Sequence, residues 1–461
     1  MNTRTIVRTV AGSVVGLALA GSAVFVGVTG LPQGALSWAG SEGVPQVRVT
    51  PAPAETVLAC DGPLLALGVD PTDAAAFASL SDLDLTLGAE TGDGPKRAND
   101  LDLEGVGSAT ILTQAPDGDA PVSVAGAGSA TLDDPEAVGY VASACRAGSP
   151  ESWIAGASGQ TGVSDIIVVA NPSEVPATVS LEVYGVDGRI VPAGSDFAVP
   201  AHGQRAVPVA SVAGTEQNPV IHVTSRNAPV RVTLQSITTS GLAQQGIDLE
   251  DATLPMTTAV VPRVTVTAAT ADAGSAATTV QLMGTTKNAG SVAIDVVDEK
   301  TGEVAAHTSI ELTPQVPVSA AFDSLEEGSY AVRLTSDVPI VSAVRQSAGD
   351  DYAWYVPSEP ITGETFVAAP AGIDGKIAFG FAAFDEDATV TLAPLDGGRA
   401  KRIDLTAGHS ATAVVDDDTL YRVSVEGGSV AGSVGTSDDG HIGGFTIPAD
   451  PATPDPVIVT P

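Results

Sequence analysis

The stretch Ile166–Val183, which reads IIVVANPSEVPATVSLEV, contains two runs of β-branched and aliphatic residues separated by an Asn-Pro step. Apolar and small polar residues alternate in the second run, as they do in a strand with one buried face. An Asp187-Gly188 step follows, which is typical of a tight turn between antiparallel strands. The pattern predicts consecutive β-strands whose aliphatic side chains share a core.

Similar stretches recur at intervals of about a hundred residues further along the chain. A second copy contains Val292–Val296 and Leu334–Val341, and a third, weaker copy contains Thr389–Leu392 and Val423–Val430. Repeats of this length, each with about seven short strands, indicate tandem modules with an immunoglobulin-like or fibronectin-like β-sandwich fold. A β-propeller in which each repeat supplies more than one blade is the alternative.

A shorter match places one more unit before these three. Ala142–Arg146 followed by Trp153 has the same form as Val341–Arg345 followed by Trp354, and the matching tryptophans favour a packing role. Asp70–Leu80 is the best candidate for a short helix. The expected organisation is a divergent β module at residues 56–150, repeats at 151–262, 263–358 and 359–447, and a Pro-rich tail at 448–461.

The N-terminal residues predict a membrane anchor. Residues 1–9 carry two arginines, and residues 10–31 are uncharged and would span about 33 Å as a helix, enough for a bilayer core. The charged flank places the N-terminus in the cytoplasm and the bulk of the chain outside, after a linker at residues 32–55. Small residues within Gly12–Ala20 would allow two such helices to dimerise. Cleavage near Ala39, giving a secreted protein, is the alternative.

Charge and cysteine content limit the partners. The chain has 55 acidic and 20 basic residues, a net charge of −35, which opposes binding to nucleic acids or anionic lipids. Its two cysteines, Cys60 and Cys145, both follow the anchor and are expected to form one disulfide in an oxidising compartment. In the chain-entropy model such a bond stabilises the fold by about 4 kcal/mol.

Five motifs stand out in the first repeat and its surroundings: Trp153–Gly156, Ile167–Pro172, Ala177–Gly188, Val199–Gly203 and Ala228–Val230. With these motifs the chain resembles an uncharacterised family of exported actinobacterial proteins. The resemblance implies a domain of unknown function with an N-terminal membrane segment and β-sandwich-like repeats, and it implies no chemistry. The third repeat departs from the pattern, with Phe384–Asp387 in place of the Asn-Pro step.

The sequence offers little material for catalysis. The common signatures of serine and zinc hydrolases do not occur in it, nor does a phosphate-binding or dinucleotide-binding loop. His202 and His409 fall at matching turns of two repeats, which favours a turn role over that of a general base. Acidic runs such as Asp385–Asp387 and Asp416–Asp418 lack the ordered spacing of a Ca²⁺-binding loop, although oxygen-rich loops can hold that ion. We therefore expect no enzyme activity, no cofactor and no metal site.

The densest aromatic cluster supplies the candidate contact surface: Tyr352, Trp354 and Tyr355. We predict an extracytoplasmic scaffold or accessory that binds another envelope protein, because contact surfaces on β modules require no special residues. A carbohydrate-binding module for envelope polysaccharide is the alternative, with the three aromatic residues as its platform if they are exposed.

Overall fold

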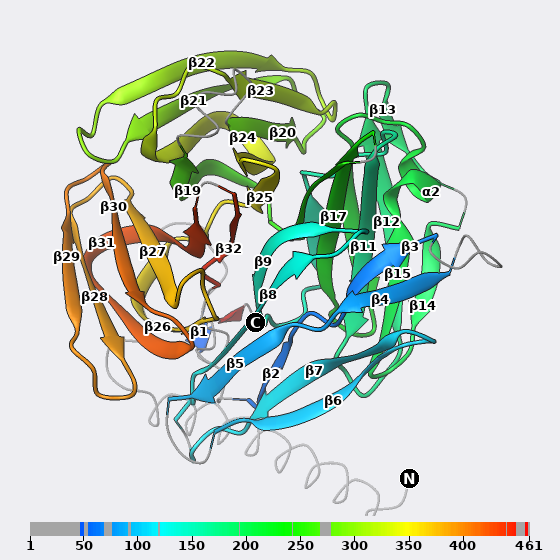
Figure 1. Cartoon of the computed structure of the whole chain (residues 1–461), viewed down its shortest axis with the longest axis horizontal. Coiled ribbons are helices and arrows are strands. Elements are labelled where there is room, and N and C mark those ends of the chain that lie inside the picture. The colour runs from blue at the N-terminus through cyan, green and yellow to red at the C-terminus, as the bar shows by residue number, and fades with distance from the viewer. Residues whose placement is uncertain are drawn as a thin grey trace, which may run out of the picture. The chain divides into compact units, whose positions relative to one another are not determined.

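The computed structural model is built almost wholly of antiparallel β-strands (Figure 1), so the all-β prediction is confirmed. α2 (Val209–Ala213) is a helix of five residues. The predicted anchor at residues 10–31 lies outside the described residues, and no helix within them is long and apolar enough to cross a membrane. The structure describes residues 47–49, 54–68, 76–90, 94–118, 120–192, 194–241, 243–267, 278–438, 440–448 and 457–459.

The three predicted repeats contain strands in a common order. The first has β10 (Glu151–Ile154), β11 (Val163–Asn171), β12 (Ala177–Gly185), β13 (Gly188–Ile190), β14 (Asp196–Val199), β15 (Gly203–Pro208), β16 (Val220–Arg226), β17 (Arg231–Ser240) and β18 (Ala243–Asp251). The second has β19 (Met256–Val266), β20 (Thr278–Gly284), β21 (Gly290–Asp298), β22 (Val304–Leu312), β23 (Val318–Phe322), β24 (Gly328–Ala348) and β25 (Asp351–Tyr355). The third has β26 (Ile361–Ala369), β27 (Lys376–Ala383), β28 (Ala388–Pro394), β29 (Lys401–Leu405), β30 (Ser410–Asp416), β31 (Thr419–Ser437) and β32 (Ile442–Thr446).

Each repeat is a sandwich of two sheets. In the second module, the first half of β24 pairs with β19 and β21, and its second half pairs with β20 and β25. β31 connects the two sheets of the third module in the same way, and the successive strands β16 and β17 do so in the first. A strand that continues from one sheet into the other belongs to a sandwich and not to separate propeller blades, so the sandwich prediction is confirmed.

The core of each module lies between its two sheets, as the alternating pattern predicts. In the second module it contains Val280, Leu282, Ile294, Val332 and Leu334, which are fully buried. β19 belongs to this module although it runs across the expected boundary between residues 262 and 263.

Residues 56–150 do not form a fourth closed sandwich. The sheet β5-β8-β9 matches the order β20-β24-β25 of the second module, whereas β2, β7 and β6 extend a sheet of the first module through β15. The prediction of a helix at Asp70–Leu80 is wrong for the residues that the structure describes, 76–80, because β4 begins there. The strands are β2 (Thr56–Ala59), β3 (Leu64–Leu67), β4 (Phe77–Ser81), β5 (Asp84–Ala89), β6 (Lys96–Leu103), β7 (Gly107–Gln114), β8 (Val124–Asp133) and β9 (Val138–Ala144).

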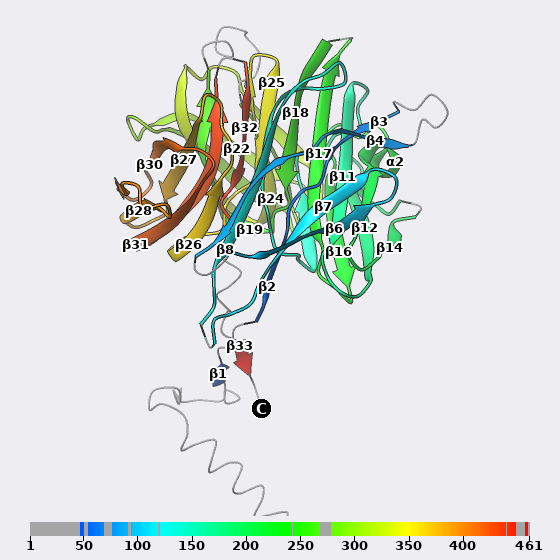
Figure 2. The ribbon, with the colours of Figure 1, turned by 60° about the horizontal axis from the view of Figure 1, so that its bottom comes forward.

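The final strand of each unit meets the others along one axis. β9, β18, β25 and β32 contact one another in cyclic order, and we call them the axial strands. Figure 2 shows β18, β25 and β32 side by side. Each is an edge strand of its own sheet and is hydrogen-bonded there on one side only. The three sandwiches and the strands of residues 56–150 therefore pack together into one compact body, residues 54–452, and are not independent domains.

A second unit comprises residues 1–53 and 453–461. In it, β1 (Val47–Val49) pairs antiparallel with β33 (Val457–Val459). The expected linker and the expected Pro-rich tail thus contain short strands that pair with each other.

Candidate functional site: the axial junction and the Arg263 groove

The three aromatic residues predicted as a partner surface are buried, so that prediction is wrong. Tyr352 and Tyr355 are each 1% exposed and Trp354 is 5% exposed. They lie on the axial strand β25, where they contact other modules: the Tyr352 hydroxyl donates to Ser236 Oγ at 2.8 Å, and Trp354 packs in a cluster with Ala155. They are contact residues between modules and cannot serve as an exposed sugar platform.

The Asp351 carboxylate connects three axial strands. Its Oδ2 accepts hydrogen bonds from the backbone nitrogens of Tyr140 on β9, at 2.9 Å, and Ile442 on β32, at 3.0 Å. Edge strands leave such N–H groups without a partner in their own sheet. The carboxylate fits because two residues beside it are glycines with positive φ; a Cβ on Gly139 or Gly246 would lie 2.4 or 2.7 Å from Asp351 Oδ1.

Two carboxylates of β18 also bind backbone amides: Asp248 links the first module to the second, and Glu250 binds the segment that follows β10 within the first module. Asp248 Oδ2 accepts from the backbone nitrogen of Trp354 at 2.5 Å. Glu250 Oε1 accepts from the backbone nitrogens of Ala155 and Gly156 at 3.0 and 3.1 Å. Buried acids therefore satisfy backbone donors that no β-ladder pairs, both between modules and within the first module.

Burial changes the ionisation of these acids. It raises the pKa of Asp351 and of Asp165 to about 7 and that of Glu250 to about 8, and it raises the pKa of Asp248 as well. Hydrogen bonds from backbone N–H groups oppose the rise but do not cancel it. Raised pKa values often mark catalytic acids. Here the four residues are at most 4% exposed and face backbone amides, so a substrate has no access to them.

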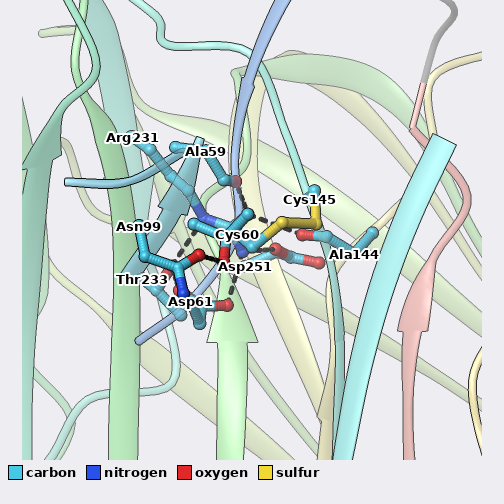
Figure 3. The surroundings of a disulfide bond; sticks show 10 residues. Ala59, Cys60, Asp61, Asn99, Ala144, Cys145, Arg231, Thr233 and Asp251 are labelled. Carbon is cyan, nitrogen blue, oxygen red and sulfur yellow. Dashed lines mark hydrogen bonds and ion pairs between the residues drawn. A yellow bond between two sulfur atoms is a disulfide. The ribbon is translucent and has the colours of Figure 1, made fainter. Parts of the chain in front are cut away.

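A second set of buried charges surrounds the disulfide (Figure 3). Cys60 and Cys145 are bonded, as predicted, and both are buried. Arg231 of β17 donates hydrogen bonds from Nη1 to the carbonyl oxygens of Ala59, at 2.5 Å, and Ala144, at 2.6 Å. These two alanines directly precede the two cysteines. This arginine thereby connects both ends of the disulfide to the first module.

Carboxylates balance this charge. Arg231 Nη2 lies 2.6 Å from Asp61 Oδ2 and 3.6 Å from Asp251 Oδ1. Asp251 Oδ2 also pairs with Arg146 at 2.6 Å, and Arg146 donates to the carbonyl oxygen of Thr446 on β32 at 2.5 Å. The network joins the disulfide region to the first and third modules, and it compensates the cost of burying each charge.

A groove of about 420 Å³ lies between the second and third modules. Arg263 of β19 lines it although the residue is 4% exposed. Within the described residues, its guanidinium makes one hydrogen bond, from Nη1 to the Tyr355 hydroxyl at 3.2 Å, and no carboxylate forms an ion pair with it. We call this feature the Arg263 groove. Its other polar lining residues include Thr265, Asp374, Lys376, Ser437 and Asp438.

The backbone at Arg263 explains how the side chain enters the groove. The pairing of β19 with β24 shifts register between Val261 and Val264, which marks a β-bulge, and Arg263 within it has φ 58°. A bulge redirects the side chains of a strand, and a left-handed conformation at a residue other than glycine is strained.

The remaining predicted residues have structural surroundings. His202, with φ 51°, lies in the turn before β15 as expected, and its Nδ1 is 3.0 Å from Asp100 Oδ2. His409 lies in the corresponding turn before β30. Among the residues that the structure describes, no group of three or more His, Cys, Asp or Glu side chains is arranged to hold a metal ion.

Sequence reasoning missed Asp351, Asp248, Glu250 and Arg263. A signal was present in β18, where Asp248 and Glu250 alternate with the buried Ile247 and Leu249 in a strand that is buried on both faces. Charged residues at such positions are unusual unless they are paired or hydrogen-bonded. In a chain with 55 acidic residues this signal does not stand out.

A family model for a family of unknown function, DUF5719, matches residues 102–418, more than half of the chain. The chain belongs to the DUF5719 family. The predicted membership of an uncharacterised family is thus confirmed. The DUF5719 match runs from β6 to the turn before β31 and so spans the three sandwiches, apart from the last strands of the third.

The other comparisons add little to the family assignment. No curated protein matches this DUF5719 chain. Among solved structures, the FN1–FN3 domains of chicken CNTN1 align at 11% identity over 68% of this chain and 98% of that one, with a TM-score of 0.11. A TM-score this low does not inform the fold.

Proposed function

We propose that this protein is a non-enzymatic scaffold of the cell envelope that binds another envelope protein outside the cytoplasm. Residues 10–31 would hold it in the membrane with the N-terminus inside. The observation that carries the proposal is the axial junction, the set of contacts among the axial strands. There, buried carboxylates and the charged network around the disulfide connect all four units.

A connected array of this kind suits a scaffold because its outer strands and hairpins keep fixed relative positions. Binding of a partner then costs little conformational entropy, because the scaffold is already ordered before the partner binds. Exposed apolar residues lie on different modules, with Val186 69% and Val304 54% exposed. They are suitable positions for a crosslinking probe.

The test is crosslinking in living cells with a tagged full-length chain that carries a photoreactive residue at position 186 or 304. Capture of the same envelope protein in repeated experiments, lost when residues 56–448 are deleted, would support the scaffold role. Recovery of polysaccharide without a protein would favour the glycan-binding alternative, and recovery of neither would contradict both. A product in the medium that begins after Ala39 would contradict the anchor.

A further inference from the structure

We propose that the Arg263 groove binds a hydroxyl-rich anion, namely a saccharide or polyol that carries a carboxylate or a phosphate group. The proposal goes beyond the scaffold role and does not depend on it. Buried charges in proteins are normally paired or bind a ligand. Arg263 is only 4% exposed, yet it lines an open groove. Within the described residues its one hydrogen-bond partner is the neutral hydroxyl of Tyr355.

The chemistry of the arginine selects the anion. A guanidinium presents several N–H donors in a planar fork that matches a carboxylate or a phosphate. In Arg263 only Nη1 is engaged within the described residues, by the Tyr355 hydroxyl, which leaves donors for a ligand. The bulge and the φ of 58° place this group in the groove at some cost in backbone strain.

The rest of the lining suits a ligand with hydroxyl groups. Asp374 and Asp438 supply carboxylate acceptors, and Thr265 and Ser437 supply hydroxyls that can donate or accept. Lys376 adds a second positive charge at the rim, where its only ion pair within the described residues is with Asp416. A few convergent polar groups in a concave site are what orients a small ligand.

A neighbouring groove allows a longer ligand. It has a volume of about 290 Å³ and shares Lys376 and Val414 with the Arg263 groove. Arg399 and Lys401 line it. Four basic residues and four acidic residues, Asp374, Asp396, Asp416 and Asp438, thus line two adjoining grooves. The lining is balanced in charge, whereas the chain as a whole has a net charge of −35 that opposes non-specific anion binding. An anion therefore needs a local site of this kind.

The experiment is calorimetric titration of the full chain in detergent with three probes: tetragalacturonate, glycerol 1-phosphate and the neutral maltotetraose. We expect at least one of the two anionic probes to bind, and maltotetraose to bind at least about tenfold more weakly, because a charged hydrogen bond is lost. Binding of tetragalacturonate alone identifies a carboxylated sugar, and binding of glycerol 1-phosphate alone identifies a phosphate.

Variants assign the binding to the groove. Arg263→Gln should weaken the anionic probe at least about tenfold, and Lys376→Gln should weaken it several-fold, whereas the exposed Lys287→Gln in another loop should not. If Arg263→Gln does not fold, the comparison of Lys376→Gln with Lys287→Gln decides. The proposal is overturned if neither anionic probe binds at millimolar concentration, if maltotetraose binds equally well, or if the folded variants bind like the wild type.

Discussion

Asp351 Oδ2 lies 2.9 Å from the backbone nitrogen of Tyr140, a residue 211 positions earlier in the chain. Neither residue belongs to the other's sheet. The contact takes the place of a ladder hydrogen bond where edge strands of two different sheets meet without pairing. Because the same carboxylate also binds Ile442, one side chain holds the ends of three units together.

Exchange of Asp351 for Asn should destabilise residues 54–452. The amide offers one acceptor oxygen, and its NH₂ group would face backbone donors, so at least one buried N–H group would lose its partner at a cost of about 1–3 kcal/mol. The exposed neighbour Asp350→Asn is the matched control and should change stability by less than about 0.5 kcal/mol. Urea denaturation measures both, and equal midpoints for the two variants would contradict the role of Asp351.

Stability should fall as the pH rises from 5 to 8.5. The folded-state pKa values of about 7 for Asp351 and Asp165 and about 8 for Glu250 lie above the values near 4 of an unfolded chain. Raised pKa values of acids favour folding at low pH, and this contribution is lost as the pH passes through 7 and 8. We expect the melting temperature to be about 5 °C higher at pH 5.5 than at pH 8.5.

Repulsion among the many surface acids also lowers stability as the pH rises. A variant must therefore separate this effect from that of the buried acids. Glu250→Gln keeps an oxygen for the amides of Ala155 and Gly156 but cannot ionise, so it should reduce the pH dependence by the share that Glu250 contributes. The exposed Glu327→Gln should not. The measurement is made at high salt, where surface repulsion is screened. The same slope in both variants would show that Glu250 does not contribute to the pH dependence.

Removal of the disulfide by the double change Cys60→Ala and Cys145→Ala should cost about 4 kcal/mol in the free energy of unfolding. The bond lies beside Arg231, so its loss should also loosen the contact between β9 and the first module. Guanidinium denaturation of the oxidised wild type and of the variant tests this. An unchanged midpoint would mean that the buried charges alone hold this region.

Truncation of Trp354 to Ala should destabilise the protein by about 3–5 kcal/mol, because it leaves a cavity at the contact between the first and second modules. Val186→Ala, at a residue that is 69% exposed, serves as the control. A partner surface would behave in the opposite way: the melting temperature would remain unchanged while binding of the partner was lost.

The sandwich fold and the disulfide could be predicted from the sequence because both depend on local pattern or on a simple count. Aliphatic alternation around Val179 and Leu181 identifies a strand with one buried face, and two cysteines have one way to pair within a chain. The helix expected at Asp70–Leu80 failed where β4 begins, since a short apolar run fits either structure.

The match between Trp153 and Trp354 misled the interpretation. Trp153 lies on β10, the first strand of its module, and Trp354 on β25, the last strand of the next. A better match was available: Ala120-Pro121-Val122 precedes β8, as Ala228-Pro229-Val230 precedes β17. This match identifies β8 and β9 of residues 56–150 as the counterparts of β17 and β18.

The axial junction could not be predicted from local pattern. Which edges meet depends on the packing of whole modules, and a carboxylate that binds amides of another module has the same one-residue signature as a solvated acid. Asp350 and Asp351 illustrate this, because adjacent identical residues are exposed and buried respectively.

The central claim is that the axial strands hold the units together through carboxylate–amide hydrogen bonds. Amide hydrogen exchange of the intact protein, followed by mass spectrometry of peptides that cover β9, β25 and β32, tests it most directly. The account predicts slow exchange at Tyr140, Trp354 and Ile442, and faster exchange at Tyr140 and Ile442 in Asp351→Asn. Rapid exchange at these amides in the wild type, as at free sheet edges, would contradict it.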